Sequence, residues 1–105
     1  MTFAHLHSLR DTYTQKRHNV IESYRRHLRP EALLTALRRV TDQTLREILK
    51  TAPLPRDAAL AAVGGYGRGE LYPYSDIDVL ILLAHEPDSE DQVRLEKLVA
   101  ALWDL

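Results

Sequence analysis

The sequence predicts an α+β fold: an N-terminal helical hairpin followed by a strand, a glycine-rich turn or short helix, a second strand and a helix. Two observations lead to this prediction. Apolar residues recur every three or four positions over residues 6–49 and again near the C-terminus, which is the spacing of amphipathic helices. Between these segments, two short apolar runs flank a group of glycines, and such runs are typical of strands. We expect the two strands to form a mixed or antiparallel sheet.

The first half of the chain predicts two long helices. The first runs from about residue 4 to 28, with the apolar stripe Leu6, Leu9, Tyr13, Val20, Tyr24 and Leu28. Pro30 suits the first turn of the second helix, whose stripe is Leu33, Leu37, Val40, Leu45, Ile48 and Leu49. Residues 1–52 are therefore predicted to form a helical hairpin arm, and the prolines at positions 53 and 55 mark the connector into a second unit, residues 53–105.

The second unit predicts strands at Ala58–Val63 and Ile77–Leu83, separated by the glycine-rich stretch. A last helix is expected to begin after Asp88 or Ser89 and to run to about Trp103. Ser89 and Gln92 have the spacing of a capping box. The expected packing face of this helix comprises Val93, Leu95, Leu98, Val99, Leu102 and Trp103.

Asp76 and Asp78 are the strongest candidates for a metal site. They are two positions apart, so on a strand both side chains leave the same face, with Cα atoms roughly 6.5 Å apart, while Ile77 and Val79 point into the core. Two ionised carboxylates this close repel each other, and a hard divalent cation with oxygen ligands removes that penalty. The pair therefore predicts a Mg²⁺ site. The alternative is structural: Ser75 and Asp76 cap a turn, and Asp78 faces solvent.

Gly64 and Gly65 are the candidate phosphate site. Without Cβ atoms they allow backbone N–H groups to approach an anion, and a helix beginning there adds its positive end. Phosphate at the glycines and metal at the aspartates indicate a nucleoside triphosphate. For the two groups to meet, the end of the first strand must lie beside the start of the second, which favours antiparallel neighbours. The alternative for the glycines is a plain tight turn.

The residues between the glycines and the aspartates leave several interpretations open. Arg68 could contact a phosphate or pair with Glu70, and Ser75 could bind the triphosphate or cap a turn. Gly67 and Gly69 are expected to serve turn geometry and close packing. The three tyrosines of the stretch, Tyr66, Tyr72 and Tyr74, are expected to pack around the turn, and one of them could stack near the nucleotide.

The order Gly64-Gly65, a spacer, then Asp76-Ile77-Asp78 resembles the signature of the DNA polymerase beta-like nucleotidyltransferase superfamily. Within it, the run over residues 64–78 is similar, nearly residue for residue, to the bacterial protein-PII uridylyltransferase/uridylyl-removing family. The close match covers roughly residues 59–84. This resemblance implies that residues 53–105 form a partial nucleotidyltransferase core.

The resemblance also implies an activity: Mg²⁺-dependent transfer of UMP from UTP to a tyrosine of the PII nitrogen-regulatory protein, with release of pyrophosphate. Asp76 and Asp78 would be the catalytic, metal-binding residues, and Gly64, Gly65, Arg68 and Ser75 would bind the nucleotide. Members of the superfamily generally use a third carboxylate on a later strand, and no acidic residue here falls on such a strand. We therefore expect this chain to have little or no transferase activity by itself.

Two other functions stay open at this point. The chain could belong to a different nucleotidyltransferase, such as an adenylyl-transferring relative, because nothing in these residues reads the base. It could also be a non-catalytic nucleotide-binding or interaction module of the same fold, with the basic hairpin as its docking surface.

Composition narrows the setting of the protein. The 105 residues include no cysteine, which excludes disulfides and thiolate metal sites and fits a reducing cytoplasm. No apolar run reaches the ~20 residues of a membrane helix, and the N-terminus lacks a basic-then-apolar signal, so a cytoplasmic protein without membrane contact is expected. Most of the 14 basic residues lie in the first half, but its arginines sit opposite the leucines of the helices, so no nucleic-acid binding is expected.

Overall fold

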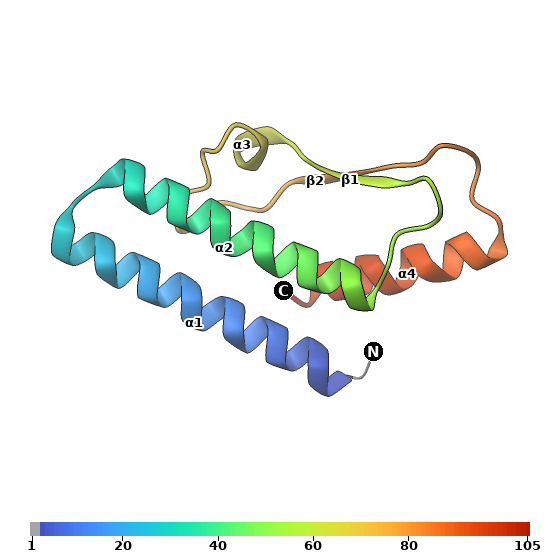
Figure 1. Ribbon diagram of the computed structural model, residues 1–105, viewed down its shortest axis with the longest axis horizontal. Helices are drawn as coiled ribbons and strands as arrows, with labels where there is room; N and C mark the ends of the chain where they lie inside the picture. Colours follow the sequence, from blue (N-terminus) through green and yellow to red (C-terminus); the bar gives the residue numbers. More distant parts are fainter. Residues whose placement is uncertain (1–2) are drawn as a thin grey trace.

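The structure, a computed structural model, describes residues 3–105. Its N-terminal part forms the predicted helical hairpin (Figure 1). Helix α1 (Phe3–His27) and helix α2 (Pro30–Thr51) run antiparallel. Their interface buries Tyr13, whose hydroxyl lies 3.0 Å from Thr41 Oγ1, together with Leu33 and Leu37. The side chain of Leu6, which was predicted to join this stripe, lies outside the described residues.

The connection between the helices corrects one member of the predicted stripe. Leu28 is 69% exposed and has a left-handed φ of 52°, so it does not pack against α2. Its backbone N–H donates to the Tyr24 carbonyl at 2.7 Å, so it closes the last turn of α1 directly after His27. Pro30 then begins α2 as predicted, and Glu31 lies in the first turn, near the positive end of the helix dipole.

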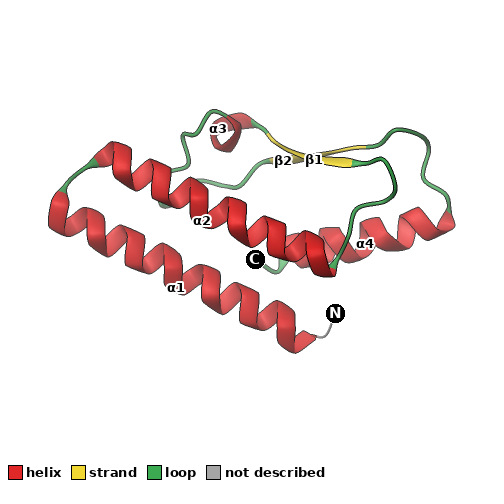
Figure 2. Cartoon of the chain, viewed as in Figure 1, coloured by secondary structure: helices red, strands yellow, loops and turns green. Residues whose placement is uncertain are grey.

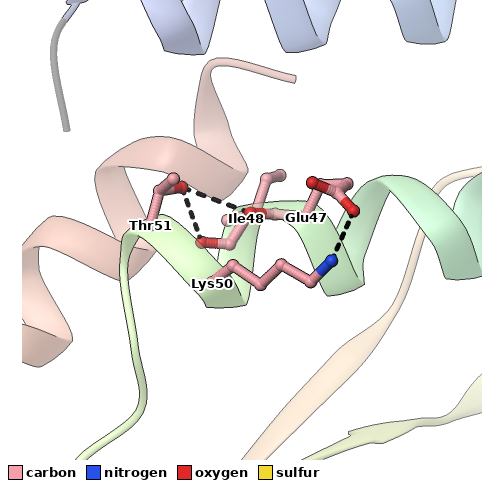
Figure 3. A network of polar contacts seen from close by, with 4 residues as sticks. All are labelled: Glu47, Ile48, Lys50 and Thr51. Atoms are coloured by element: carbon pink, nitrogen blue, oxygen red, sulfur yellow. Dashed lines mark hydrogen bonds and ion pairs between the residues drawn. The ribbon is translucent and has the colours of Figure 1, made fainter.

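The end of α2 is stabilised by its own last turn (Figure 3). Thr51 Oγ1 donates to the carbonyl oxygens of Glu47 at 3.2 Å and Ile48 at 3.1 Å. Lys50 Nζ lies 2.9 Å from Glu47 Oε1, and this partner holds the pKa of the Glu47 carboxyl below its usual value. The Ile48 carbonyl also accepts from the Ala52 N–H at 2.7 Å, so the Thr51 hydroxyl adds a further contact to the last turn of the helix.

The two strands confirm the expected antiparallel arrangement (Figure 2). Strand β1 (Ala59–Ala62) pairs with β2 (Val79–Leu82), with Ala59 opposite Leu82 and Ala62 opposite Val79. Between them lies the short helix α3 (Gly64–Gly67). The fold is therefore the predicted α+β type, with each strand shorter than the sequence indicated.

The core lies between α2, the inner face of the sheet and the last helix, α4 (Ser89–Trp103). Its buried members lie on α2, α3 and α4 or in the segments next to them: Leu45, Ile48, Ala52, Tyr66, Leu71, Leu98 and Ala101. Ile77, Val79 and Ile81 pack against them, as the alternation along the second strand predicted. Leu80 and Leu82 point the other way and are 48% and 50% exposed. Figure 1 shows α2 between α1 and the strands.

The start of α4 is one of the two that were predicted, but the capping box is formed by other residues. Asp88 is the N-cap, and its side chain accepts from the Asp91 N–H while Asp91 accepts from the Asp88 N–H. The predicted capping box of Ser89 and Gln92 is therefore wrong by one position, because Asp88 is the residue with extended backbone before the first turn.

The packing face of α4 was also predicted too broadly. Leu98 and Ala101 are buried, whereas Val93, Val99 and Trp103 are 52%, 40% and 85% exposed. Trp103 and Val99 are rotated well away from Leu98 on a helix with 3.6 residues per turn, so they lie outside the narrow contact that α4 makes with α2 and the sheet. No helix in residues 3–105 is both long enough and apolar enough to span a membrane.

Candidate active site

The site is built where the β1–β2 ladder ends. The Val63 N–H donates to the Asp78 carbonyl at 3.0 Å, which is the last hydrogen bond before β1 turns into α3. This bond brings Gly64 beside Asp78. Gly64 has a φ of +59°, and a Cβ atom placed on it would lie 2.9 Å from Asp78 Oδ2. The carboxylate of Asp78 therefore lies directly against the backbone of Gly64, and only glycine leaves it that space.

Asp76 and Asp78 precede β2 rather than belonging to it, which differs from their predicted place on the strand. The reason is that β1, the neighbouring strand, ends at Ala62 and the chain then enters α3. The backbone of Asp76 and Ile77 therefore has no strand to pair with. The alternation of sides nevertheless continues: both aspartates are exposed, while Ile77 and Val79 contact the core. Both aspartates are therefore open to solvent, and Asp78 is the one that lies against Gly64.

The chemistry of the aspartates fits a hard divalent cation. Within residues 3–105, neither carboxylate forms an ion pair or a side-chain hydrogen bond, so their oxygens stay available as ligands. Mg²⁺ is usually bound through one or two carboxylates with water and substrate phosphates completing the shell. In the described part of the chain, no group of three or more histidine, cysteine, aspartate or glutamate side chains gathers at one place. Metal binding at the pair stays a prediction.

Helix α3 continues directly from β1. The Gly67 N–H donates to the Val63 carbonyl at 2.9 Å, and the Arg68 N–H donates to the Gly64 carbonyl at 3.2 Å. A Cβ atom on Gly67 would lie 2.7 Å from the Ala62 carbonyl oxygen, so this glycine permits the close packing that was expected of it. The first N–H groups of a helical turn have no partner within it, so those at Gly64 and Gly65 are left without a partner inside α3.

The loop after α3 shows the structural alternatives for its polar residues. Arg68 Nε lies 3.2 Å from Glu70 Oε2, and both side chains are exposed. Ser75 closes a turn: its N–H donates to the Tyr72 carbonyl, and its Oγ accepts from the Tyr72 N–H, both at 3.0 Å. A nucleotide-binding role for Arg68 and Ser75 stays a prediction.

The tyrosines of this stretch separate into two kinds. Tyr66 is 4% exposed and belongs to the core, as expected. Tyr72 and Tyr74 are 55% and 96% exposed, so the prediction that they pack around the turn is wrong. The turn at Pro73 directs both side chains outward.

Contacts from the helical hairpin to this loop were not predicted. The Tyr66 hydroxyl donates to Asp42 Oδ1 on α2, and Arg17 Nη2 on α1 donates to the Pro73 carbonyl. Burial and the Asp42 carboxylate raise the pKa of Tyr66, so the phenol keeps the proton that it donates. The available signal was the position of Asp42, an acidic residue one turn before the buried Leu45 on the inner side of α2.

Comparison with known proteins gives the family. The nucleotidyltransferase domain family matches residues 42–104. The bifunctional uridylyltransferase/uridylyl-removing enzyme of Bordetella avium (strain 197N) is 56% identical over 95% of this chain, and that of Bordetella parapertussis is 53% identical over all of it. A third such enzyme, from Cupriavidus pinatubonensis, is 56% identical over 70% of the chain.

The chain spans 12% of the length of both Bordetella enzymes and 8% of the Cupriavidus enzyme. No solved structure matches it. The glycine helix beside the exposed aspartates lies inside the matched residues, and the chain belongs to the nucleotidyltransferase domain family.

Proposed function

We propose that this chain provides the nucleotide site of a Mg²⁺-dependent nucleotidyl transfer, with UTP as donor and a tyrosine hydroxyl of the PII protein as acceptor. The observation that carries the proposal is the contact between Asp78 and Gly64: a Cβ atom at Gly64 would lie 2.9 Å from Asp78 Oδ2. Uridylyl transfer is supported by the names of the similar Bordetella and Cupriavidus enzymes. The PII acceptor rests on the resemblance of residues 64–78 to its modifying enzymes.

The glycines and the aspartates of the site bind different parts of the Mg²⁺–nucleotide complex. The N–H groups of Gly64 and Gly65 bind the triphosphate, because they have no partner inside α3. Asp76 and Asp78 hold Mg²⁺. The bound cation would neutralise phosphate charge and stabilise the departing pyrophosphate.

The loop residues add contacts to the phosphates. Arg68 and Ser75 lie in the exposed loop between α3 and Asp76. Arg68 would leave Glu70 and bind a phosphate oxygen instead. Breaking this exposed ion pair costs at most about 1 kcal/mol. The Ser75 hydroxyl accepts from the Tyr72 N–H and keeps its own proton to donate to a phosphate oxygen.

Equilibrium binding tests this proposal. Isothermal titration of the chain with UTP should give an affinity that falls at least tenfold when Mg²⁺ is removed by a chelator. Asp78→Asn should reduce the affinity to a similar extent, whereas Glu86→Gln, which removes an exposed charge beyond β2, should not. Equal affinity for UTP with and without Mg²⁺, together with an unchanged Asp78→Asn variant, would show that the site is not the proposed one.

Competition and transfer assays then define the reaction. Displacement of UTP by CTP, GTP and ATP should show a preference for the uracil base, and a preference for ATP would favour an adenylyl-transferring enzyme. Incubation with PII and UTP labelled at the α-phosphate tests transfer itself. We expect low turnover from this chain, because in the described residues no third histidine, cysteine, aspartate or glutamate joins a group that could hold a metal ion.

A further inference from the structure

Helix α3 is too short to be stable without contacts to the rest of the chain. It comprises four residues, fewer than one and a half turns, and helices this short are not stable by themselves. The placement of Gly64 beside Asp78 must therefore come from contacts that α3 and its flanking residues make with the rest of the chain.

Besides the hydrogen bond between Val63 and Asp78, the side chain of Tyr66 makes a contact of this kind. It is 4% exposed and packs in the core with Ile48 and Leu98. Its hydroxyl donates to Asp42 Oδ1, and Asp42 lies on the long helix α2. In residues 3–105, Asp42 forms no ion pair. The hydroxyl of Tyr66 is therefore the group that its carboxylate binds.

The hairpin also contacts the far end of the same loop. Arg17 on α1 donates to the carbonyl of Pro73, and its guanidinium lies 5.4 Å from the centre of the Tyr13 ring. Tyr13 in turn shares its 3.0 Å hydrogen bond with Thr41, the neighbour of Asp42. The loop that joins the glycines to the aspartates is thus fastened to the helical hairpin at both of its ends.

We propose that Asp42 is a positioning residue for the nucleotide site: through the Tyr66 hydroxyl it orients α3 and so places the Gly64 backbone against Asp78. Neither Asp42 nor Tyr66 touches the nucleotide in this arrangement. The effect on nucleotide binding rests on the proposed function, whereas the effect on α3 exists without any ligand.

Two matched tyrosine variants test the proposal. Tyr66→Phe and Tyr13→Phe each remove a hydroxyl from a tyrosine that is 4% exposed and hydrogen-bonded to α2, but only Tyr66 belongs to α3. Both should lower overall stability, Tyr66→Phe by more because its hydroxyl donates to a carboxylate and that of Tyr13 meets a neutral hydroxyl. The Tyr13→Phe variant also keeps an aromatic ring beside Arg17, so the contact to Pro73 is retained in the control.

The readout is amide hydrogen exchange in the ligand-free protein, followed at residues 67–70. The N–H groups of Gly67, Arg68 and Glu70 donate to backbone carbonyls at 2.9, 3.2 and 2.8 Å, so their exchange reports the opening of α3. Tyr66→Phe should speed exchange there by about tenfold, the size expected for losing a hydrogen bond to a charged group, under conditions in which Tyr13→Phe does not.

Asp42 variants separate positioning from simple packing. Asp42→Asn keeps an oxygen that accepts from the Tyr66 hydroxyl, so it should retain most of the protection at residues 67–70. Asp42→Ala removes the acceptor and should behave as Tyr66→Phe does. Asp42→Ala and Tyr66→Phe should weaken Mg²⁺-dependent UTP binding about tenfold, while Asp42→Asn and Tyr13→Phe should stay within about threefold of the unmodified protein.

The outcomes are distinct. Exchange at residues 67–70 that is unchanged in Tyr66→Phe, or raised equally in Tyr13→Phe, overturns the proposal. Failure of the unmodified protein to bind UTP overturns the proposed function, while the exchange measurements still decide whether Asp42 orients α3. Faster exchange in Tyr66→Phe with unchanged UTP affinity would show that Asp42 stabilises α3 but does not position the nucleotide site.

Discussion

Replacing Gly64 by alanine is the most direct perturbation of the site. Gly64 has a φ of +59°, a backbone conformation that costs an L-residue roughly 1–2 kcal/mol. The new Cβ atom would also meet Asp78 Oδ2 at 2.9 Å, so an ordinary contact of 3.4 Å requires the carboxylate to move by about 0.5 Å. We therefore expect Gly64→Ala to lower the free energy of unfolding and to displace Asp78.

The two effects are measured separately. The strain should lower the thermal midpoint by roughly 4–10 °C, since about 1 kcal/mol corresponds to several degrees in a domain of this size. Circular dichroism at increasing temperature checks this value. The displaced carboxylate should weaken Mg²⁺-dependent UTP binding by about tenfold or more, because small misplacements at a site of this kind have large effects.

Gly69→Ala is the matched control. Gly69 has a φ of +74°, so alanine there meets similar backbone strain, but its Cβ atom would lie 3.4 Å from the end of the Arg38 side chain and far along the loop from Asp78. It should lose similar stability and retain UTP binding. If Gly64→Ala binds UTP as well as Gly69→Ala does, the contact between Gly64 and Asp78 does not shape the site.

Three further predictions concern single contacts. Gly67→Ala should lower the free energy of unfolding by about 1–3 kcal/mol in urea, because its Cβ atom would lie 2.7 Å from the Ala62 carbonyl oxygen and the backbone itself must shift. Leu28→Gly should raise that free energy by about 0.5–1 kcal/mol, since a left-handed φ of 52° is unfavourable for leucine and open to glycine; unchanged or lower stability would contradict this. Lys50→Gln should raise the pKa of Glu47 toward its usual value, which an NMR titration measures. Because the pKa of Glu47 is lower in the folded protein than in the unfolded chain, the Lys50–Glu47 pair favours folding at a pH above the unfolded-state pKa. This contribution is lost as the pH falls through the folded-state pKa.

The strands and the glycine turn were readable from the sequence because their signals are local. Side chains alternate along a strand, so the order Asp76, Ile77, Asp78, Val79 alone separates the exposed residues from those that contact the core. Glycines that end an apolar run mark the place where the chain leaves the ladder, and the last ladder bond indeed joins Val63 to Asp78.

Other features depend on contacts between distant segments, which spacing does not show. The predicted face of α4 included Val99 and Trp103 because apolar residues were counted without knowing how narrow the contact with α2 would be. The bond between Asp42 and Tyr66 joins residues 24 positions apart, and each has an ordinary local explanation. The metal and nucleotide roles of the site need ligands to be tested, so they stay predictions.

Trp103 determines which spectroscopic signal will follow unfolding. It is the single tryptophan of the chain, and its indole is 85% exposed at the end of α4. The indole is surrounded by water in the native protein and in the denatured chain alike, so its emission maximum should scarcely shift during denaturation. A flat fluorescence trace would therefore not indicate a stable protein, and the far-ultraviolet signal of the helices is the appropriate measure.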